Sequence, residues 1–494
     1  MKVFAGITTE LRREWHLAVS DPAVPATLGV AAVLTLLALL SGMLRTQERW
    51  ERQQILEQEN VQQRAFLESA FDDDSTSNRE LSGLTQAQQD RRSELQMSAR
   101  SADLLRFTGG HWRAMLPPSV LAGLSTGASG EWPDHYDHAG SSITATVSRT
   151  MRTSPILAAV GTFDLTLLIG AILPLAVIGL TFNVVAVDRE LGRWDLIRSQ
   201  ATSTFRLVVI RSLIRVTAIA LVVFLLTVSW ILIAPVGDVD LVAIRNIALW
   251  GGWLFVYLAF WGALAILVSS FKLSSSGSGL LLLLCWYVLV LAVPSAVEHA
   301  INTRFPLPRA SDLIAMEADV RKQLEQDVDV VWAEFLQRHP GITLDEDDPQ
   351  REFVLRDLAL IKAIRSEAHQ RTEEYFLRFR QREEQLDLCQ MLSPLLAWRT
   401  AADQCAGTSL RHFLGLARET AAFHDHYLSH FETLSLEGRE LMLTDMRELP
   451  RFQVKNLPSQ LDQAPLLLSA TSLLLWTAMG GWTNWQMMQR SDRH

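Results

Sequence analysis

Six long apolar blocks constrain this chain more than any other feature of its sequence. A helix needs about 20 apolar residues to cross the hydrocarbon core of a bilayer, which is about 30 Å thick. Blocks of that length lie at roughly 25–44, 163–185, 214–235, 244–269, 279–297 and 465–485. Apolar residues gathered in this way exclude a soluble globular protein. The sequence therefore predicts an all-α polytopic membrane protein with six transmembrane helices.

Two segments between the blocks are too long and too polar to be simple loops. Residues 45–154 and 298–464 are rich in charged and polar side chains, and each has the length of a domain. Apolar residues recur at helical spacing among Glu, Arg and Gln, which indicates that both segments are mainly helical. Pro, Gly and Ser in 116–140 indicate a folded loop region within the first segment.

Basic residues are distributed unevenly over the short flanks of the blocks. Six arginines lie in or beside the segment between the second and third blocks, whereas 236–243 carries two aspartates and no basic residue. Because cytoplasmic loops of membrane proteins are enriched in Arg and Lys, both termini are predicted to be cytoplasmic. The two long segments are then periplasmic, and the predicted location is the inner membrane of a bacterium.

The charge balance argues against nucleic acid as a partner. The chain has 45 basic and 54 acidic residues, a formal net charge of −9. That balance leaves no large basic surface for a phosphate backbone. Membrane lipid is the partner that the apolar blocks require.

The polar stretch from Val187 to Arg206, between the second and third blocks, has two interpretations. It is either a juxtamembrane helix whose arginines reach the headgroups, or a short amphipathic coupling helix that fits a groove in an ATP-hydrolysing partner. As one helix over 188–200, it would anchor itself through Leu191, Trp194, Leu196 and Ile197 and present Glu190, Arg193 and Arg198 to the partner.

This stretch resembles a segment of ABC-2-type transporter permeases, whose pattern is roughly E-x-G-x-x-[DE]-L-[LI]-x-[ST]-x-P-[VI]-[ST]. The matching residues are Glu190, Gly192, Asp195, Leu196, Ile197, Ser199, Thr202 and Ser203. Ala201 departs from the pattern, which commonly has proline there. The N-terminal TTELRREWHLAVSDPAV is also similar to the interfacial helix before the first span in that family, and six spans with both ends inside is the family's architecture.

The resemblance implies a membrane-spanning permease subunit of an ATP-driven ABC exporter. It implies two ABC ATPase subunits and a second permease chain, identical or paralogous, as partners. The residues that it assigns to coupling are Glu190, Gly192, Arg193, Trp194, Asp195, Leu196 and Arg198. The sequence contains no phosphate-binding G-x-x-x-x-G-K-[ST] pattern. The chain is therefore predicted to be no enzyme and to hold no cofactor, with ATP and Mg²⁺ bound by the partner ATPase.

These interpretations give a domain map for the chain. In order, it has a cytoplasmic interfacial helix (1–24), a first span (25–44), a first periplasmic insertion (45–154), a second span with a periplasmic extension (155–187), a cytoplasmic coupling region (188–206), three further spans (207–235, 244–269 and 279–297), a second periplasmic insertion (298–464), a sixth span (465–485) and a cytoplasmic tail (486–494).

Two histidine pairs suggest a metal site in the insertions. His135 and His138 lie in the sequence DHYDH, and His426 and His430 are four residues apart, on one face of a helix. Pairs of this kind can chelate Zn²⁺, Cu²⁺ or Ni²⁺. The alternative is a set of polar, solvent-facing histidines, and no cysteine or further ligand spacing completes a site.

Two cysteines of the second insertion suggest a disulfide. Cys389 and Cys405 would close a loop of about 17 residues, worth about 3 kcal/mol in the chain-entropy model, in an oxidising periplasm. The alternative is a pair of free thiols on separate helices.

Two other functions stay open beside the exporter. Large outer segments favour a mechanotransmitting ABC permease that acts on periplasmic partners, although six spans instead of four argue against it. A non-ABC membrane sensor or scaffold would use the spans as an anchor. In the second span, Gly170, Pro174 and Gly179 permit close helix packing or a kink.

Overall fold

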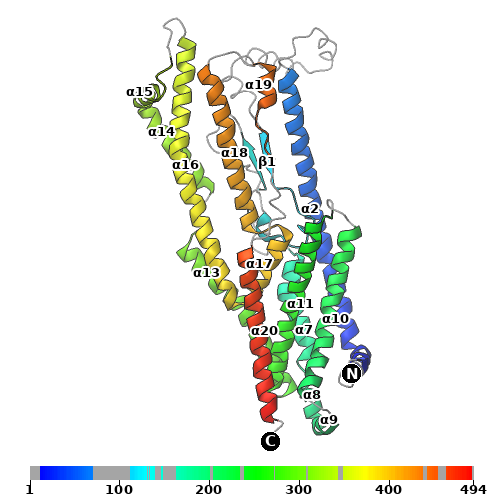
Figure 1. Ribbon diagram of the computed structural model, residues 1–494. Helices are drawn as coiled ribbons and strands as arrows, with labels where there is room; N and C mark the ends of the chain where they lie inside the picture. The colour runs from blue at the N-terminus through cyan, green and yellow to red at the C-terminus, as the bar shows by residue number, and fades with distance from the viewer. Residues whose placement is uncertain are drawn as a thin grey trace.

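A computed structural model shows a mostly helical molecule with a long bundle and an outer unit stacked on one end of it (Figure 1). The residues that it describes are 12–69, 112–130, 132, 134–138, 146–147, 163–200, 204–233, 239–271, 273–306, 310–342, 349–437, 442–453 and 463–491.

Five helical stretches are long and apolar enough to cross a membrane, which indicates a multi-pass membrane protein. They are α2 (Ala23–Ser69); α6 (Leu165–Leu167) with η4 (Leu168–Ile172), α7 (Leu173–Thr181) and α8 (Ala186–Glu190); α10 (Thr204–Ile233); α11 (Leu241–Ser269); and α12 (Ser275–Trp286) with η5 (Tyr287–Ala292) and α13 (Val293–Arg304). The predicted sixth span lies in α20 (Gln463–Ser491), whose shorter apolar stretch is Gln463–Ala478.

The first span does not end where its apolar block ends. Helix α2 continues without a break from the bundle into the outer unit, so residues 45–69 of the first insertion belong to the same helix as the span (Figure 1). No Pro or Gly interrupts residues 45–69, so nothing in the sequence stops the helix there. The start of α2 and the end of α20 lie at the same end of the bundle (Figure 1). The predicted extension of the second span at 155–162 lies outside the described residues.

Helix α11 forms the centre of the bundle. Its aromatic residues Trp250, Tyr257 and Trp261 are among the largest fully buried side chains. Helix α10 approaches it closely, because a Cβ at Gly251 would lie only 2.4 Å from the ring of Phe224. The helix starts at Asp240, whose carboxylate accepts a hydrogen bond from the backbone N–H of Ala243 (2.7 Å), as N-cap residues do.

The outer unit is the polar end of the molecule, and the described part of both insertions is mainly helical, as predicted. Besides the second half of α2, its helices are α14 (Ala310–Gln326), α15 (Val328–Arg338), α16 (Pro349–Cys389), α18 (Leu410–Glu437) and α19 (Leu443–Glu448). The two insertions form one unit, because Leu116 and Tyr136 of the first pack with Phe376, Phe379 and Phe413 of the second.

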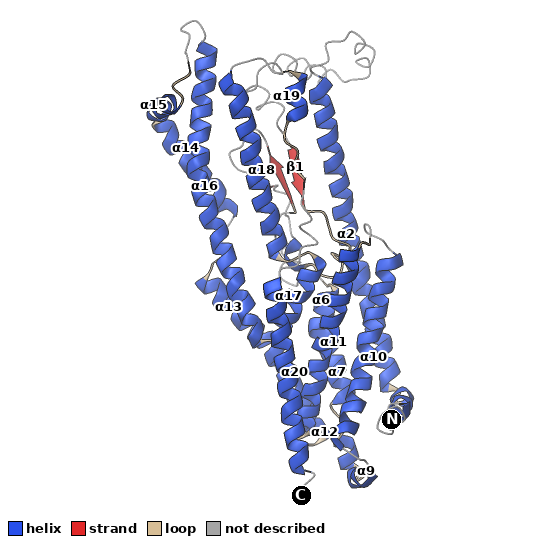
Figure 2. Cartoon of the chain, viewed as in Figure 1, coloured by secondary structure: helices blue, strands red, loops and turns tan. Residues whose placement is uncertain are grey.

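A small antiparallel sheet, which the sequence analysis did not predict, lies between α18 and α2 (Figure 2). Its strands, in the order β1-β2-β3, are β1 (Trp112–Met115), β2 (His135–His138) and β3 (Thr146–Val147). Trp112 lies opposite His138, and Met115 lies opposite His135. The Asn60 side chain of α2 hydrogen-bonds the carbonyl (2.8 Å) and the N–H (3.0 Å) of Arg113, which fixes β1 to the long helix.

One helix of the second insertion lies inside the bundle, which corrects the predicted domain map. Helix α17 (Pro394–Ala406) contributes Trp398, Ala402 and Cys405 to the bundle core, where it packs against α11 and α20. Ser393 caps its start, and Gly407, with φ +69°, ends it in the left-handed region that favours glycine. The helix is short and mixes polar with small apolar residues, so its length and hydropathy do not identify it as a membrane segment.

Candidate functional site

The predicted coupling helix over 188–200 is two helices with a turn between them. Helix α8 ends at Glu190, and α9 (Trp194–Gln200) begins four residues later. Gly192 in the turn has φ +68°, and a Cβ there would meet nothing within 4 Å, so backbone conformation rather than space favours glycine at this position. The prediction of one continuous helix is wrong, because the spacing of apolar residues does not reveal that Gly192 has a left-handed backbone conformation.

A network of charges, in which Glu14 is buried and Asp188 and Arg211 are half-buried, fastens this turn to the rest of the bundle. Asp188 pairs with Arg211 of α10 (2.8 Å) and with Arg193 of the turn (3.3 Å). Arg211 also pairs with Glu14 (3.0 Å), which lies in the helical residues 12–20 before α2 and is only 5% exposed. A buried charge is tolerated only when it is paired and hydrogen-bonded. Arg211 therefore joins the N-terminal helix, α8 and α10 at one point.

Two further contacts surround this network. The guanidinium of Arg215, one helical turn above Arg211, lies 3.9 Å from Asp21. Arg189 donates to the carbonyl of Ser269 at the end of α11. Together with Arg211, these arginines fix the positions of four segments at one end of the bundle.

Glu190 has an internal partner that the sequence did not predict. Its carboxylate accepts a hydrogen bond from the backbone N–H of Ser275 (2.7 Å), at the first residue of α12. Ser274 caps the same helix through the N–H of Gly277 (3.2 Å). Negative charge at a helix N-terminus interacts favourably with the helix dipole. Glu190 thus connects the α8–α9 turn to the fifth span.

The other predicted coupling residues divide between the bundle and the surface. Trp194 packs against a buried cluster of Val184, Val185, Val208 and Ile266. Leu191 and Leu196 are 61% and 62% exposed. The side chains of Asp195 and Arg198 lie outside the described residues. We call the exposed face of Leu191, Arg193 and Leu196 the turn surface.

The predicted metal ligands do not meet a third donor among the described residues. His135 Nδ1 lies 2.9 Å from its neighbour Asp134, and the side chain of His138 lies outside the described residues. His426 is exposed on α18, whereas burial lowers the pKa of His430 despite the opposing charges of Asp445 and Glu448. Within the described segments, no group of three or more His, Cys, Asp or Glu side chains could hold an ion.

The predicted disulfide is not formed, and Cys389 and Cys405 are separate thiols. Cys389 is the half-buried last residue of α16, whereas Cys405 is buried in the bundle core near the end of α17. Burial raises the pKa of the Cys405 thiol to about 12. The break in the chain around Ser393 turns α17 into the bundle, so the two cysteines lie on separately packed helices.

The opposite end of the bundle carries a second polar cluster. Asp164 caps α6 by accepting from the N–H of Leu167 (2.8 Å) and also accepts from the N–H of Thr126 (2.8 Å). It is only 6% exposed, which shows a structural role at the contact between the second span and the outer loop. Nearby, Ser125 donates to Asp403 of α17, and burial raises the pKa of Asp403 to about 6.

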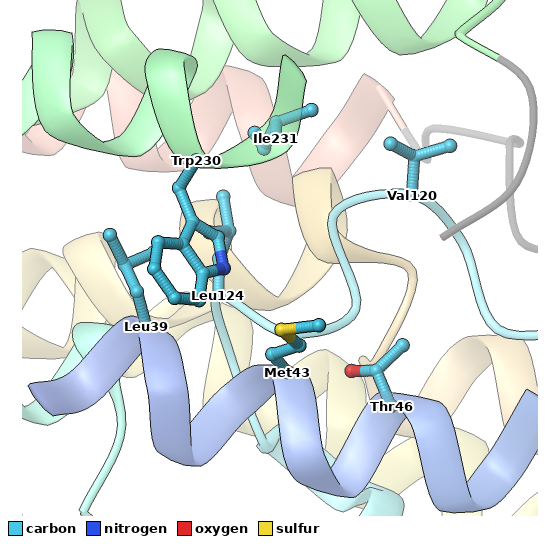
Figure 3. A pocket seen from close by; sticks show the side chains of 8 residues that line it. Leu39, Met43, Thr46, Val120, Leu124, Trp230 and Ile231 are labelled. Atoms are coloured by element: carbon cyan, nitrogen blue, oxygen red, sulfur yellow. The ribbon is translucent and has the colours of Figure 1, made fainter. Parts of the chain in front are cut away.

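A small apolar pocket lies between α2, α10 and this outer loop (Figure 3). Its lining residues are Leu39, Met43, Thr46, Val120, Gly123, Leu124, Trp230 and Ile231. The lining is mostly apolar and contains no charged side chain, and its polar side-chain groups are the Thr46 hydroxyl and the Trp230 indole N–H.

Comparison with known proteins finds one family match. Residues 310–455 match a domain of unknown function (DUF3526). This segment begins with α14 and includes α16 to α19, so it covers the outer helices and α17 but none of the five long apolar stretches. No curated protein and no solved structure matches the chain. The match identifies the outer helices as a recurring domain and assigns no activity to it.

Proposed function

We propose that this chain is the membrane-spanning permease subunit of an ATP-driven ABC exporter in a bacterial inner membrane. In this proposal two separate ABC ATPase subunits bind and hydrolyse ATP with Mg²⁺, and a second permease chain, identical or paralogous, completes the translocation path. The turn surface is the contact with the ATPase. The ABC-2 resemblance of residues 190–203 supports this assignment, together with the position of α9 at the end of the bundle away from the outer unit (Figure 2).

The observation that carries the proposal is the arrangement of contacts behind the turn surface. Arg211 links the turn to the N-terminal helix and α10, and Glu190 links it to α12. A displacement of the turn by a partner would therefore move three segments of the bundle. A juxtamembrane loop that only satisfied the positive-inside rule would need no buried ion pairs.

The first experiment is affinity purification of the full chain in mild detergent with nucleotide present, followed by mass spectrometry. We expect a nucleotide-binding subunit to be recovered with the chain. If none is recovered, the exporter assignment fails, and the sensor or scaffold becomes the favoured function.

The second experiment localises the contact. Leu196→Asp places a charge in the turn surface and should reduce recovery of the ATPase at least about tenfold, because an unpaired charge at an interface costs several kcal/mol. Val330→Asp is the matched control, since Val330 is 59% exposed on α15 of the outer unit. Equal recovery with both variants would place the ATPase elsewhere. Glu190→Lys should also weaken recovery, but it disturbs the start of α12 as well.

One observation favours the mechanotransmitting permease as the second candidate. Helix α2 runs unbroken from the bundle to the sheet of the outer unit, where Asn60 holds β1. A continuous helix can carry a displacement from the membrane to a periplasmic partner. Substrate bound between two permease chains would decide against this candidate.

A further inference from the structure

Two spans contain the same local irregularity. In the second span the π-helical turn η4 precedes Pro174, and in the fifth span the π-helical turn η5 precedes Pro294. Proline has no N–H, so a carbonyl about one turn earlier loses its helical donor. Inside a membrane no water replaces that donor, and each such carbonyl needs another partner.

Side chains from other helices donate to carbonyls of both turns. In η4, Leu173 donates to the carbonyl of Leu168, five residues earlier, so the carbonyl that Pro174 leaves without a donor in this register is that of Ile169. Tyr257 of α11 donates to the next carbonyl, that of Gly170, four residues before Pro174 (2.5 Å). In η5, Val293 donates to the carbonyl of Val288, five residues earlier, so the next donor in this register would be Pro294. The carbonyl left without a donor is that of Leu289, and the hydroxyl of Ser393 donates to it (2.6 Å).

Helix α17 contacts both irregular spans. Ser393, its N-cap, reaches Leu289 of the fifth span, and Trp398 donates from its indole to the carbonyl of Thr166 in the second span (3.1 Å). The packing is close, because a Cβ at Gly170 would lie 2.5 Å from Leu395 and 3.2 Å from Trp398. A single short helix thus holds carbonyls of two spans through residues five positions apart.

The chain on either side of α17 is joined to the outer unit and to α20. Asp387, near the end of α16, pairs with Arg411 of α18 and accepts a hydrogen bond from Gln390 (2.9 Å). The Gln390 side chain in turn accepts from Ser469 of α20 (2.5 Å). Because α16 and α18 flank α17 in the chain, a movement of either helix acts on α17.

We propose that α17 is a latch between the outer unit and the second and fifth spans. Ser393 holds the fifth span through Leu289, Trp398 holds the second span through Thr166 and through its contact beside Gly170, and withdrawal of α17 lets both spans change shape together. The purpose of such a change rests on the proposed transport function, whereas the latch itself does not. In such a latch, the loss of either hydrogen bond destabilises the helical structure of both spans.

The test is hydrogen exchange of the full chain in lipid nanodiscs, followed by mass spectrometry of peptides from 165–181 and 287–304. Trp398→Phe removes the donor to the second span and keeps the ring, and Ser393→Ala removes the donor to the fifth span. We expect each variant to speed exchange about fivefold in both peptides, the factor for the loss of one typical hydrogen bond.

The matched control is Trp250→Phe. Trp250 is fully buried near Trp398, with ring centroids 6.0 Å apart, but its Nε1 has no hydrogen-bond partner among the described residues, so exchange should not change. Faster exchange only in the span that loses its own donor would overturn the latch, as would no change in either variant. If Trp398→Phe does not fold, Ser393→Ala alone tests the latch. Ser393→Thr keeps a hydroxyl donor and should restore the original exchange rate in both peptides. Recovery of the ATPase, measured separately, distinguishes failure of the latch from failure of the transport proposal.

Discussion

The bundle and the outer unit are built from the same kind of helix but are stabilised by different interactions. Helix α11 packs through buried aromatic residues and glycines, and its neighbours come close enough for side chains to reach backbone carbonyls. Helix α16 instead faces α18 through ion pairs, with Glu432 accepting from Lys362 and Arg365. In lipid, helices gain little from burying apolar area, so packing and hydrogen bonds decide. In water, apolar cores form and exposed ion pairs add little.

Helix α17 shows that these interactions, rather than chain position, decide which region a helix belongs to. It belongs to the second insertion by sequence and to the bundle by contact, because its small and aromatic residues suit packing against α11 and its Ser393 and Trp398 supply hydrogen bonds that lipid cannot. The boundary between the two regions is therefore set by partners rather than by position in the chain.

The largest effect is expected where the bundle holds charges. Arg211→Met leaves buried Glu14 without its ion-pair partner and half-buried Asp188 with Arg193 alone, which should cost about 3 to 5 kcal/mol. We expect a large drop in the thermal unfolding midpoint in nanodiscs, or loss of folded protein. Arg338→Met is the control, because Arg338 pairs with Glu334 on the exposed surface of α15 (3.1 Å). Equal effects of both variants would contradict the buried network.

A smaller effect should distinguish close packing from open space within one span. Gly170→Ala places a methyl group 2.5 Å from Leu395 and should destabilise the protein by about 1 to 3 kcal/mol, as overpacking does. Gly179→Ala in the same span meets nothing within 4 Å and should be neutral or slightly stabilising. Thermal unfolding of both variants checks the difference, and a destabilised Gly179→Ala would contradict the packing.

The stability of the outer unit should depend on pH, whereas the apolar core of the bundle should contribute no such dependence. Burial and the neighbouring Asp387 raise the pKa of Glu383 to about 7, although Arg411 and Arg382 lower it. The folded protein then binds a proton more tightly than the unfolded chain, so this contribution stabilises at low pH and is lost as pH rises from about 4.5 to about 7. In Glu383→Gln the decline of the unfolding midpoint with pH should be smaller, and the part that Asp403 contributes as pH rises from about 3.8 to about 6 should remain. An unchanged decline would assign it to other groups.

The smallest effect is expected at the ion pairs between α16 and α18. Glu432→Gln weakens the contacts with Lys362 and Arg365, both partly exposed, and should cost less than about 1 kcal/mol. The loss should shrink at high salt, because screening already weakens such pairs. A larger, salt-independent loss in thermal unfolding would show that this face resembles the bundle.

The helices were predictable where local pattern decides them. The blocks at 25–44 and 244–269 lie within α2 and α11, and the helical spacing in the second insertion is matched by helices such as α16. The ends of these helices were less predictable. The continuation of α2 to Ser69 and the break at Gly192 depend on the presence or absence of a stop signal rather than on periodicity.

The candidate site was predictable in place but not in contacts. The sequence predicted a coupling region at 188–206, and its residues Asp188, Glu190 and Arg193 lie at the end of α8 and in the turn that follows, at one end of the bundle. It did not predict that Arg211 pairs with both Asp188 and Glu14, because 197 positions separate Arg211 from Glu14. The cysteine pair shows the opposite error, since short spacing suggested partners that packing separates.

The sequence by itself determined the helical class, the apolar spans and the polar insertions, because each follows from hydropathy and period over about 20 neighbouring residues. Only the tertiary structure decided that α17 enters the bundle, that Tyr257 and Ser393 satisfy the carbonyls before two prolines, and that Cys405 is a core thiol. These features depend on groups brought together from distant parts of the chain. In a membrane such polar groups must hydrogen-bond with one another, because neither water nor lipid supplies them with partners.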